Sequence, residues 1–395
     1  MPKIKANADG QVTLPESFLK MRNLTPEGEY WLDERDGDLV LHYCLPDARK
    51  LYIEATTACN LDCHTCIRHS WTDPNAHMST ETFERILDGL SAFPKLERVV
   101  FTSFGEPLVH PRLLDMIAAL RERGLGVTLG TNGLLLTEKV LRELIRLGVD
   151  QLVVSIDGVN PETYADIRGV QQRMIIENID LLNLLKKELK VNHPVLGVEF
   201  VALRSNVTEV EQLPELASRL NAARTVVSHV LPYTAEMNEQ KLYGYEPKPP
   251  LRTSGWPVRS DAWVRWGIME LPRMHWGGEP RCRFVNDYAI VIDWDGEVSP
   301  CYALSHSYRY FALDGIEKQV ERHTFGNIHH QSLSDIWTSE DYVRFRSEVR
   351  AFHFPSCPDC ELRETCDLRK TNEGCWGLNP SCADCLWAQD IVRCP

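Results

Sequence analysis

The sequence predicts an α/β protein built on a partial (β/α)6 barrel, with a small β unit before the barrel and an irregular, cysteine-rich domain after it. Between residues 46 and 234, short apolar segments alternate with amphipathic helical segments. Near the N-terminus, Asp36-Gly37 separates two short strand-like segments, which is a hairpin signal. Nine of the thirteen cysteines follow residue 281, where the hydrophobic periodicity is lost. We therefore expect metal to replace much of a hydrophobic core in the last domain.

These features divide the chain into four expected parts. They are a β unit over residues 1–45, the barrel over residues 46–234, a Trp- and Pro-rich segment over residues 235–275, and the cysteine-rich domain over residues 276–395. The third part contains Lys248-Pro-Pro250. It is either a linker packed over the barrel mouth or a flap that contacts substrate.

The N-terminal unit is expected to be a hairpin with a short helix in front of it. The strands are Tyr30–Asp33 and Asp38–His42, and the helix covers about Glu16–Met21. This pattern resembles the swapped-hairpin units of the AbrB type, in which two chains interleave. Such units usually bind DNA, but residues 1–44 carry five Lys and Arg against eight Asp and Glu. We therefore expect a homodimer or partner contact here rather than a DNA contact.

Six βα units imply parallel strands joined by right-handed crossovers. In such sheets, functional sites gather at the carboxyl ends of the strands. Ser79 and Thr137 are expected N-caps of two of the helices. The six expected strands are Leu51–Ala55, Arg98–Phe104, Gly126–Gly130, Gln151–Ile156, Val195–Leu203 and Val226–Leu231.

The composition is that of a globular protein, with 43% hydrophobic and 25% charged residues. The formal net charge of −13 argues against nucleic acid as the principal partner, because a phosphate-backbone binder carries a basic surface. No apolar stretch reaches the roughly 18 residues that span a membrane, and the N-terminus lacks the apolar core of a secretion signal. We expect a cytoplasmic protein without a membrane partner.

Three cysteines lie in the short loop after the first expected barrel strand, with the spacing Cys59-x3-Cys63-x2-Cys66. Three thiolates ligate three irons of a [4Fe–4S] cubane and leave the fourth iron open. An open iron can chelate the amino and carboxylate groups of S-adenosylmethionine (SAM). Zinc is the alternative, since His64 or His69 can supply a fourth ligand.

The segment from Thr57 to Cys66 resembles the signature of radical SAM enzymes. The resemblance implies that an electron from the reduced cluster breaks the S–C5′ bond of SAM and releases a 5′-deoxyadenosyl radical. Loops after the next strands agree in order with the family: Gly105-Glu-Pro107, Thr131-Asn-Gly133 and Ser155-Ile-Asp-Gly158. The SAM-binding residues that the resemblance implies are Gly105, Glu106, Pro107, Asn132, Ser155, Asp157, Arg168 and Asn206. For Arg168, a surface ion pair is the alternative role.

The cysteines after residue 281 resemble the SPASM domain, which carries one or two auxiliary iron–sulfur clusters. The resemblance implies that the first cluster is held by Cys282, Cys301 and Cys375, and the second by Cys357, Cys360 and Cys366. The remaining ligands of both clusters would come from Cys382, Cys385 and Cys394. The alternative is a pair of structural zinc sites built from Cys357 with Cys360 and from Cys382 with Cys385.

The tail from Cys375 to Cys394, together with the N-terminal unit and the barrel, resembles the SPASM-type maturases associated with tungsten-pterin aldehyde oxidoreductases. The resemblance implies a protein or peptide substrate, for which such an oxidoreductase is a candidate, and a low-potential electron donor. Two other readings stay open. One is an enzyme that forms thioether or carbon–carbon crosslinks in a ribosomal peptide, and the other is a non-enzymatic, zinc-bearing, AbrB-like DNA-binding regulator. No residue stands out as a catalytic acid or base.

Overall fold

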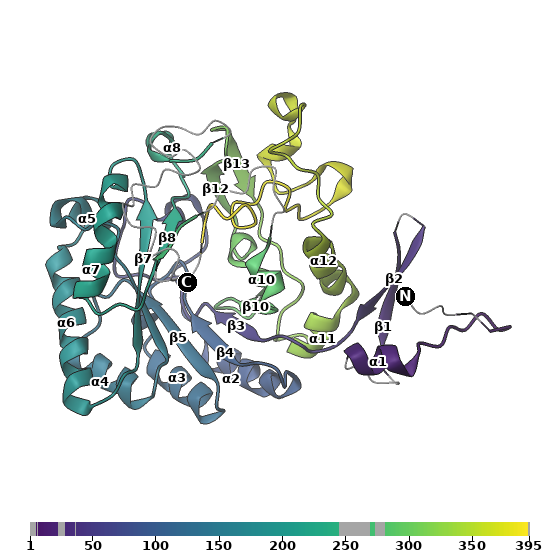
Figure 1. The fold of residues 1–395 in the computed structure, drawn as a ribbon, viewed down its shortest axis with the longest axis horizontal. Coiled ribbons are helices and arrows are strands. Elements are labelled where there is room, and N and C mark those ends of the chain that lie inside the picture. Colours follow the sequence, from purple (N-terminus) through teal and green to yellow (C-terminus); the bar gives the residue numbers. More distant parts are fainter. Residues whose placement is uncertain are drawn as a thin grey trace.

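The computed structural model describes residues 5, 7–22, 28–35, 37–244, 269–272 and 281–393. Most of the expected Trp- and Pro-rich segment, including Lys248-Pro-Pro250, lies outside these residues. Within them, the dominant feature is a nine-stranded sheet in the order β11-β10-β3-β4-β5-β6-β7-β8-β9, with helices along its outer side (Figure 1). None of the described helices is long and apolar enough to cross a membrane.

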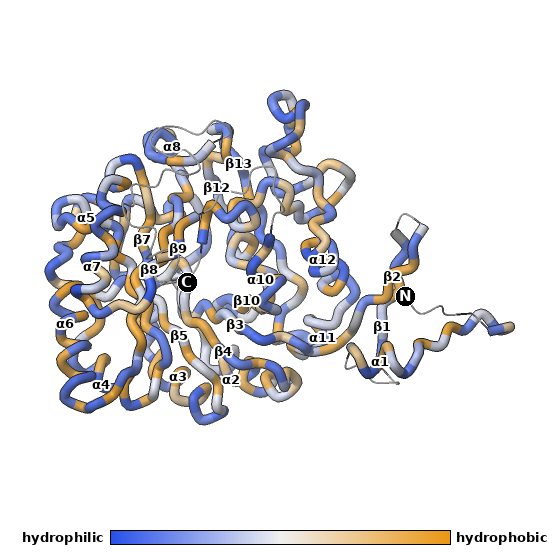
Figure 2. The backbone as a smooth tube through the Cα atoms, in the orientation of Figure 1, coloured by the Kyte–Doolittle hydropathy of each residue, from blue (hydrophilic) through white to orange (hydrophobic). Residues whose placement is uncertain are grey.

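Six consecutive parallel strands form the centre of this sheet, which confirms the predicted barrel. Hydrophobic residues occur along these strands (Figure 2), and most of the strand residues are buried, as expected for strands that are covered on both faces. The strands are β3 (Lys50–Ile53), β4 (Arg98–Phe101), β5 (Gly126–Thr131), β6 (Gln151–Ser155), β7 (Val195–Ala202) and β8 (Arg224–His229).

Helices between the strands cover the outer side of the sheet (Figure 1). The side chain of Ser79 accepts a hydrogen bond from Thr82 N, and that of Thr137 accepts one from Val140 N, so both predicted N-caps are confirmed. The helices are α2 (Thr80–Gly89), α3 (Leu113–Glu122), α4 (Glu138–Arg146), α5 (Pro161–Arg168), α6 (Gln172–Leu189), α7 (Leu213–Arg219) and α8 (Ala235–Gln240).

The sheet extends beyond the predicted barrel at both edges. On one side β9 (Met269–Glu270) pairs with β8. On the other side β10 (Ala289–Ile292) runs parallel to β3 and pairs with β11 (Val298–Ser299). The C-terminal domain therefore begins as a continuation of the barrel sheet, which fixes its position beside the first barrel strand.

The N-terminal unit contains α1 (Glu16–Arg22) and an antiparallel hairpin of β1 (Tyr30–Arg35) and β2 (Asp38–Tyr43), so the predicted hairpin is confirmed. One side of the hairpin contacts the body of the protein, where Trp31 Nε1 donates to Thr338 O at 3.0 Å. The hairpin projects from the body beside α12 (Glu340–Ala351) (Figure 1).

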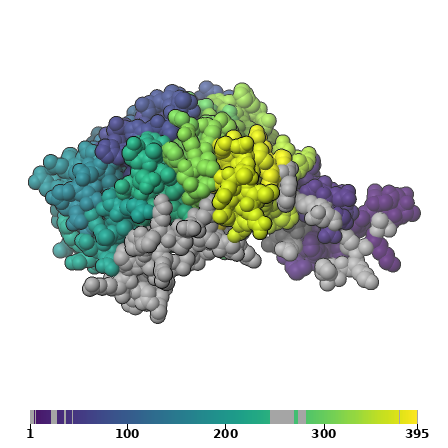
Figure 3. Space-filling model, turned by 90° about the horizontal axis from the view of Figure 1, so that it is seen from above, coloured from purple at the N-terminus to yellow at the C-terminus, as the bar shows by residue number. Residues whose placement is uncertain are grey.

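The rest of the C-terminal domain has a small hairpin, short helices and a long irregular end. Its elements are α10 (Arg283–Asn286), β12 (Tyr308–Phe311), β13 (Glu317–Val320), α11 (Leu333–Thr338) and α12. Residues 352–393 form only turns and short 3-10 helices. In Figure 3 these last residues, in yellow, lie between the barrel and the N-terminal unit.

Candidate functional site

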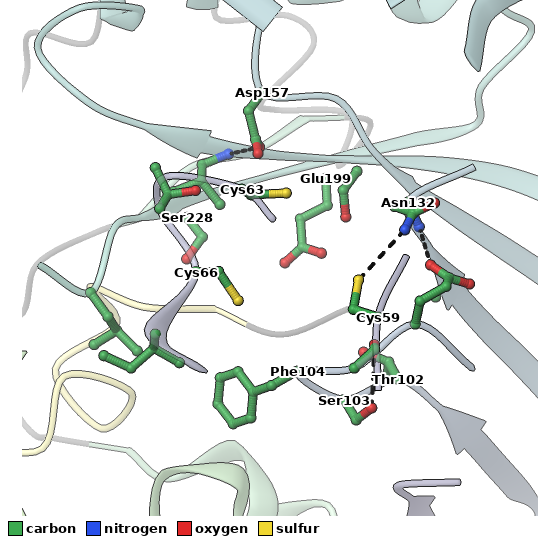
Figure 4. A pocket seen from close by; sticks show the side chains of 18 of the residues that line it. Cys59, Cys63, Cys66, Thr102, Ser103, Phe104, Asn132, Asp157, Glu199 and Ser228 are labelled. Carbon is green, nitrogen blue, oxygen red and sulfur yellow. Dashed lines mark hydrogen bonds between the residues drawn. The ribbon is translucent and has the colours of Figure 1, made fainter. Parts of the chain in front are cut away.

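A cavity of about 250 Å³ opens at the carboxyl ends of the barrel strands. Cys59, Cys63 and Cys66 line it together with residues from the loops after β4, β5 and β6 (Figure 4). Burial raises the pKa of the Cys63 and Cys66 thiols, and the neighbouring thiols raise it further. Such a cluster of thiols is stable as thiolates when a metal group neutralises their charge.

The loop after β4 packs closely against the backbone segment that leads into the three-cysteine loop. A Cβ atom on Gly105 would lie 2.2 Å from Thr56 O and 2.8 Å from Ala58 O, which no side chain tolerates. The next residue, Glu106, donates its backbone N–H to Ala58 O at 2.9 Å. Gly105 therefore permits the close contact that fixes the chain directly before Cys59.

The side chain of Glu106 ties the loop after β4 to the loop after β5. Its Oε1 accepts hydrogen bonds from Thr131 Oγ1 at 2.8 Å and Leu108 N at 3.1 Å, and its Oε2 accepts one from Asn132 N at 2.7 Å. Burial raises the pKa of this carboxyl, and the three hydrogen bonds oppose the rise. Both oxygens are thus engaged by the protein itself.

Asn132 links this framework to the first thiol. Its Nδ2 donates to Asn60 Oδ1 at 2.8 Å and lies 3.8 Å from Cys59 Sγ, while its Oδ1 accepts from Leu134 N at 3.0 Å. A hydrogen bond to a ligating sulfur both orients the thiolate and adjusts the electronic properties of the metal group that it holds.

Arg168 forms a buried ion pair with Asp157, with Nε and Oδ2 2.6 Å apart. The arginine Nη1 also lies 3.8 Å from Cys63 Sγ. Burial lowers the pKa of this guanidinium, but Asp157 and Cys63 outweigh burial and raise it above its ordinary value. The second carboxylate oxygen of Asp157 accepts from Val201 N at 2.8 Å. The surface ion pair considered for Arg168 is therefore wrong, because the pair is buried at the cavity.

Seven of the eight predicted SAM-binding residues line the cavity, and Asn206 does not. Its buried side chain donates to Asp157 O at 2.8 Å and to Val201 O at 2.9 Å, and it accepts from Leu203 N at 2.7 Å. Because its polar atoms bond to the backbone of the loop after β6 and of the end of β7, Asn206 supports the cavity wall.

Several cavity residues carry no motif and were missed in the sequence. Glu199 on β7 faces the cavity between the cysteine loop and Asn132 (Figure 4). Its one signal was an acidic residue within an otherwise apolar strand. The C-terminal end of the chain supplies another wall, since Arg393 donates its backbone N–H to Ser228 Oγ at 3.0 Å. The remaining missed residues include Thr102, Ser103, His229, Tyr302, Trp387 and Val392.

Glu199 is a carboxyl group that can hold or release a proton near neutral pH. Its pKa is raised to about 7, by burial first and then by the charge of Asp157. Because the ionised form is disfavoured only in the folded protein, stability falls as the pH rises from about 4.5 to 7.

We expect Glu199→Gln to remove this pH dependence. The free energy of unfolding of the metal-free variant, relative to that of the wild type, should increase by about 3 kcal/mol between pH 4.5 and pH 8. Urea unfolding under reducing conditions at both pH values measures the difference. A constant difference between the two proteins would contradict the assigned environment of Glu199.

The C-terminal cysteines form two groups. In the first, burial raises the pKa of the Cys382 thiol well above its ordinary value, and the thiols of Cys385, Cys282 and Cys301 raise it further. Burial likewise raises the pKa of the Cys301 thiol well above its ordinary value, and the thiols of Cys282 and Cys385 raise it further. Four thiols therefore converge, and three of them line a cavity of about 40 Å³.

The second group contains Cys357, Cys366 and Cys375. The pKa of the Cys357 thiol is raised to about 12, by burial first, and the other two thiols contribute. Cys360 follows Cys357 in one turn, with its N–H donating to Cys357 O at 3.3 Å. Cys375 thus lies near Cys357 and Cys366, whereas the resemblance implied that it serves the first cluster. Cys394 lies outside the described residues.

Thiols are the donors that iron–sulfur clusters require, and each of the three groups supplies only thiols. The irons of a cubane stand at separate corners, so its ligands lie farther apart than those of one ion. Among the described residues, no three His, Cys, Asp or Glu side chains are close enough to share a single metal ion. Three thiols in the barrel and four in the first C-terminal group fit an open and a closed cluster, respectively.

A parallel barrel with three thiols at its carboxyl end and further thiol groups beside it is the arrangement of an iron–sulfur enzyme. Residues 53–226 match the radical SAM superfamily, and residues 282–361 match SPASM, an iron–sulfur cluster-binding domain. The chain belongs to the radical SAM superfamily, among the members with a SPASM domain. Its cofactors are a [4Fe–4S] cluster, SAM and auxiliary iron–sulfur clusters.

The relatives include the tungsten-containing aldehyde ferredoxin oxidoreductase cofactor-modifying protein of Pyrococcus furiosus. The two chains are 37% identical over 348 residues, which cover 87% of this chain and 96% of that protein. The PqqA peptide cyclase of Granulibacter bethesdensis is 26% identical over 330 residues, 80% of each chain. The structure of Streptococcus suis SuiB bound to its precursor peptide has the same fold, with a TM-score of 0.56 and 16% identity over 89% of this chain and 73% of SuiB.

When bound, the cluster and SAM supply a 5′-deoxyadenosyl radical that abstracts hydrogen. The protein's own part is to hold the three thiols and to shape the cavity around them. Gly105 and Glu106 fix the loops, Arg168 and Asn132 place positive charge and a donor beside two of the sulfurs, and the C-terminal end closes the wall beside β8. Glu199 is placed to give or take a proton within the cavity.

Proposed function

We propose that this enzyme matures a tungsten-pterin oxidoreductase, by modifying either the oxidoreductase protein or its cofactor. The observation that carries the proposal is the 37% identity to a protein named for modifying the cofactor of such an oxidoreductase, over 96% of that protein's length. A similarity of this extent includes both the barrel and the auxiliary-cluster domain, so it concerns the whole arrangement and not the SAM site alone.

The test is to produce the candidate oxidoreductase with this protein, without it, and with its Cys63→Ala variant. Mass spectrometry of the purified oxidoreductase and of its extracted cofactor should find a mass change only with the unaltered protein. Identical masses in all three samples would overturn the proposed substrate, while SAM cleavage measured separately would still report on the radical chemistry.

A second candidate is the modification of a ribosomal peptide by a crosslink. The similarity to a peptide cyclase over 80% of the chain favours it. The same mass spectrometry, applied to a short peptide encoded near the gene, distinguishes the two, since a crosslink that forms by loss of two hydrogens lowers the peptide mass by about 2 Da. The non-enzymatic regulator is set aside because the chain belongs to an enzyme superfamily.

The site assignments complete the proposal. Cys59, Cys63 and Cys66 hold the SAM-binding cluster, and the two C-terminal thiol groups hold auxiliary clusters. Gly105, Pro107, Ser155 and the Asp157–Arg168 pair surround SAM. We also propose that a low-potential electron donor reduces the clusters and that the protein works in the cytoplasm.

The N-terminal unit is proposed to be AbrB-like and to join two copies of the chain. Leu32, Leu39 and Leu41 lie on one side of the hairpin, where Leu32 pairs with Leu41, and all three are exposed. A two-stranded hairpin with an open apolar side is stabilised by a further partner. A second copy offers the same apolar side, which makes the contact self-complementary.

We expect Leu39→Asp to convert a dimer into a monomer, because it places a charge on the apolar side that the two copies would share, at its most exposed leucine. Light scattering after size-exclusion chromatography measures the mass. Leu362→Asp is the matched control, since Leu362 is similarly exposed, at 73% against 71% for Leu39, but lies in the C-terminal domain. A wild-type protein that is monomeric at all concentrations would contradict the proposed role of the hairpin.

A further inference from the structure

Lys318 is a buried lysine in the small hairpin of the C-terminal domain. It lies on β13, where Lys318 and Val320 are buried and Glu317 is exposed, so it occupies a position that an alternating strand normally gives to an apolar residue. Only 4% of Lys318 is exposed. Burying an ammonium group this completely costs free energy, so such a group is normally paired with an opposite charge or kept for a functional role.

Its partner is Asp384, whose Oδ1 lies 2.5 Å from Lys318 Nζ. Asp384 stands between Cys382 and Cys385 in the sequence, so the ion pair is attached to the loop that supplies two thiols of the first group. Lys318 and Asp384 line the 40 Å³ cavity together with Cys301, Cys382 and Cys385.

The end of β13 also contacts the segment that carries the second group: Glu321 donates its backbone N–H to Asn372 Oδ1 at 2.9 Å, and Asn372 lies between Cys366 and Cys375 in the sequence. For the Cys357 thiol, Asp384 raises the pKa and Lys318 opposes the rise. Lys318 likewise opposes the rise in the pKa of Cys382 and Cys385. The ammonium of Lys318 therefore lies within electrostatic range of thiols from both groups.

A cluster held by thiolates is anionic, and reduction adds one more negative charge. A fixed cation in a poorly hydrated site stabilises the reduced form more than the oxidised form, and a fixed anion does the opposite. Trp387 lines both the 40 Å³ cavity and the 250 Å³ cavity, so the first group is next to the site where the radical is made.

We propose that Lys318 and Asp384 together set the reduction potentials of both auxiliary clusters, Lys318 raising them and Asp384 lowering them. The pair thereby determines how readily these clusters exchange electrons with the reacting cavity. The inference rests on the proposed assignment of the C-terminal cysteines to clusters, but not on the identity of the substrate.

The test is a redox titration of the full chain, followed by electron paramagnetic resonance, with Cys59, Cys63 and Cys66 replaced by alanine so that only auxiliary clusters contribute. We expect Lys318→Met to shift both potentials to lower values and Asp384→Asn to shift both to higher values. Lys318→Arg, which keeps the charge, and the double variant, which removes both charges, should stay close to the starting protein.

Lys241→Met is the matched control for loss of a buried lysine, since Lys241 is also buried and donates to Ala312 O and Leu313 O beside the same hairpin. It should leave both potentials unchanged.

The proposal would be overturned if Lys318→Met left the potentials unchanged, or if Lys318→Met and Asp384→Asn shifted them in the same direction. An ion pair with a purely structural role would not make the two substitutions shift the potentials in opposite directions. If Lys318→Met fails to retain iron, an absent upward shift in Asp384→Asn overturns it. None of these measurements requires SAM or substrate, so they are independent of the proposed maturation.

Discussion

Replacing Cys63 with alanine is expected to abolish the cleavage of SAM. Two thiolates cannot hold a cubane in the geometry that leaves one iron open toward the cavity, and Cys63 is also the thiol beside Arg168. With dithionite as reductant under anaerobic conditions, 5′-deoxyadenosine measured by liquid chromatography and mass spectrometry should fall to the level of the enzyme-free blank. Iron bound by the C-terminal cysteines should remain.

Cys44→Ala is the matched control, because Cys44 follows the N-terminal hairpin and belongs to none of the three thiol groups. Its product yield should equal that of the wild type. Normal SAM cleavage by the Cys63 variant would show that the cluster assignment is wrong, whereas loss of all iron would show that the loop is needed for folding of the whole protein.

The barrel could be predicted because its signals are local. Each of its six strands is a segment of four to eight residues with apolar residues in it and turns at its ends, and two of its helices have N-caps that the sequence displays. By contrast, β9 and β11 have two residues each, which is too short for any periodicity. They exist because neighbouring strands offer a free sheet edge, and that is a tertiary effect.

The residues of the candidate site also fall into two sets, those that local sequence signals predict and those that only the tertiary structure reveals. The three-cysteine loop and Gly105-Glu-Pro107 were recognisable because close backbone contacts and metal ligation dictate residue type and spacing. Glu199, Trp387 and Arg393 were not, since they reach the cavity from a plain strand and from the far end of the chain. The grouping of Cys375 with Cys357 and Cys366 was not expected for a related reason: spacing alone does not say which thiols an irregular chain brings together.

Replacing Gly105 with alanine is also expected to have a large effect, on both stability and SAM cleavage. Substituting alanine would place a Cβ atom 2.2 Å from Thr56 O, and because that oxygen belongs to the backbone the strain cannot be relieved by a side-chain rotation. We expect Gly105→Ala to lower the free energy of unfolding by about 3 kcal/mol. The displaced loop would also lose the hydrogen bond from Glu106 N to Ala58 O, so SAM cleavage should fall by about 100-fold.

Gly197→Ala is the matched control for this substitution. Gly197 lies on β7, and a Cβ atom there would be 3.4 Å from Val153 Cγ2, an ordinary contact. Its stability and activity should stay near those of the wild type. Denaturant unfolding and the 5′-deoxyadenosine assay measure both variants. If Gly105→Ala behaves like Gly197→Ala, the loop after β4 has room that the structure does not give it, and the contact of Gly105 with Thr56 cannot be what holds the first thiol in place.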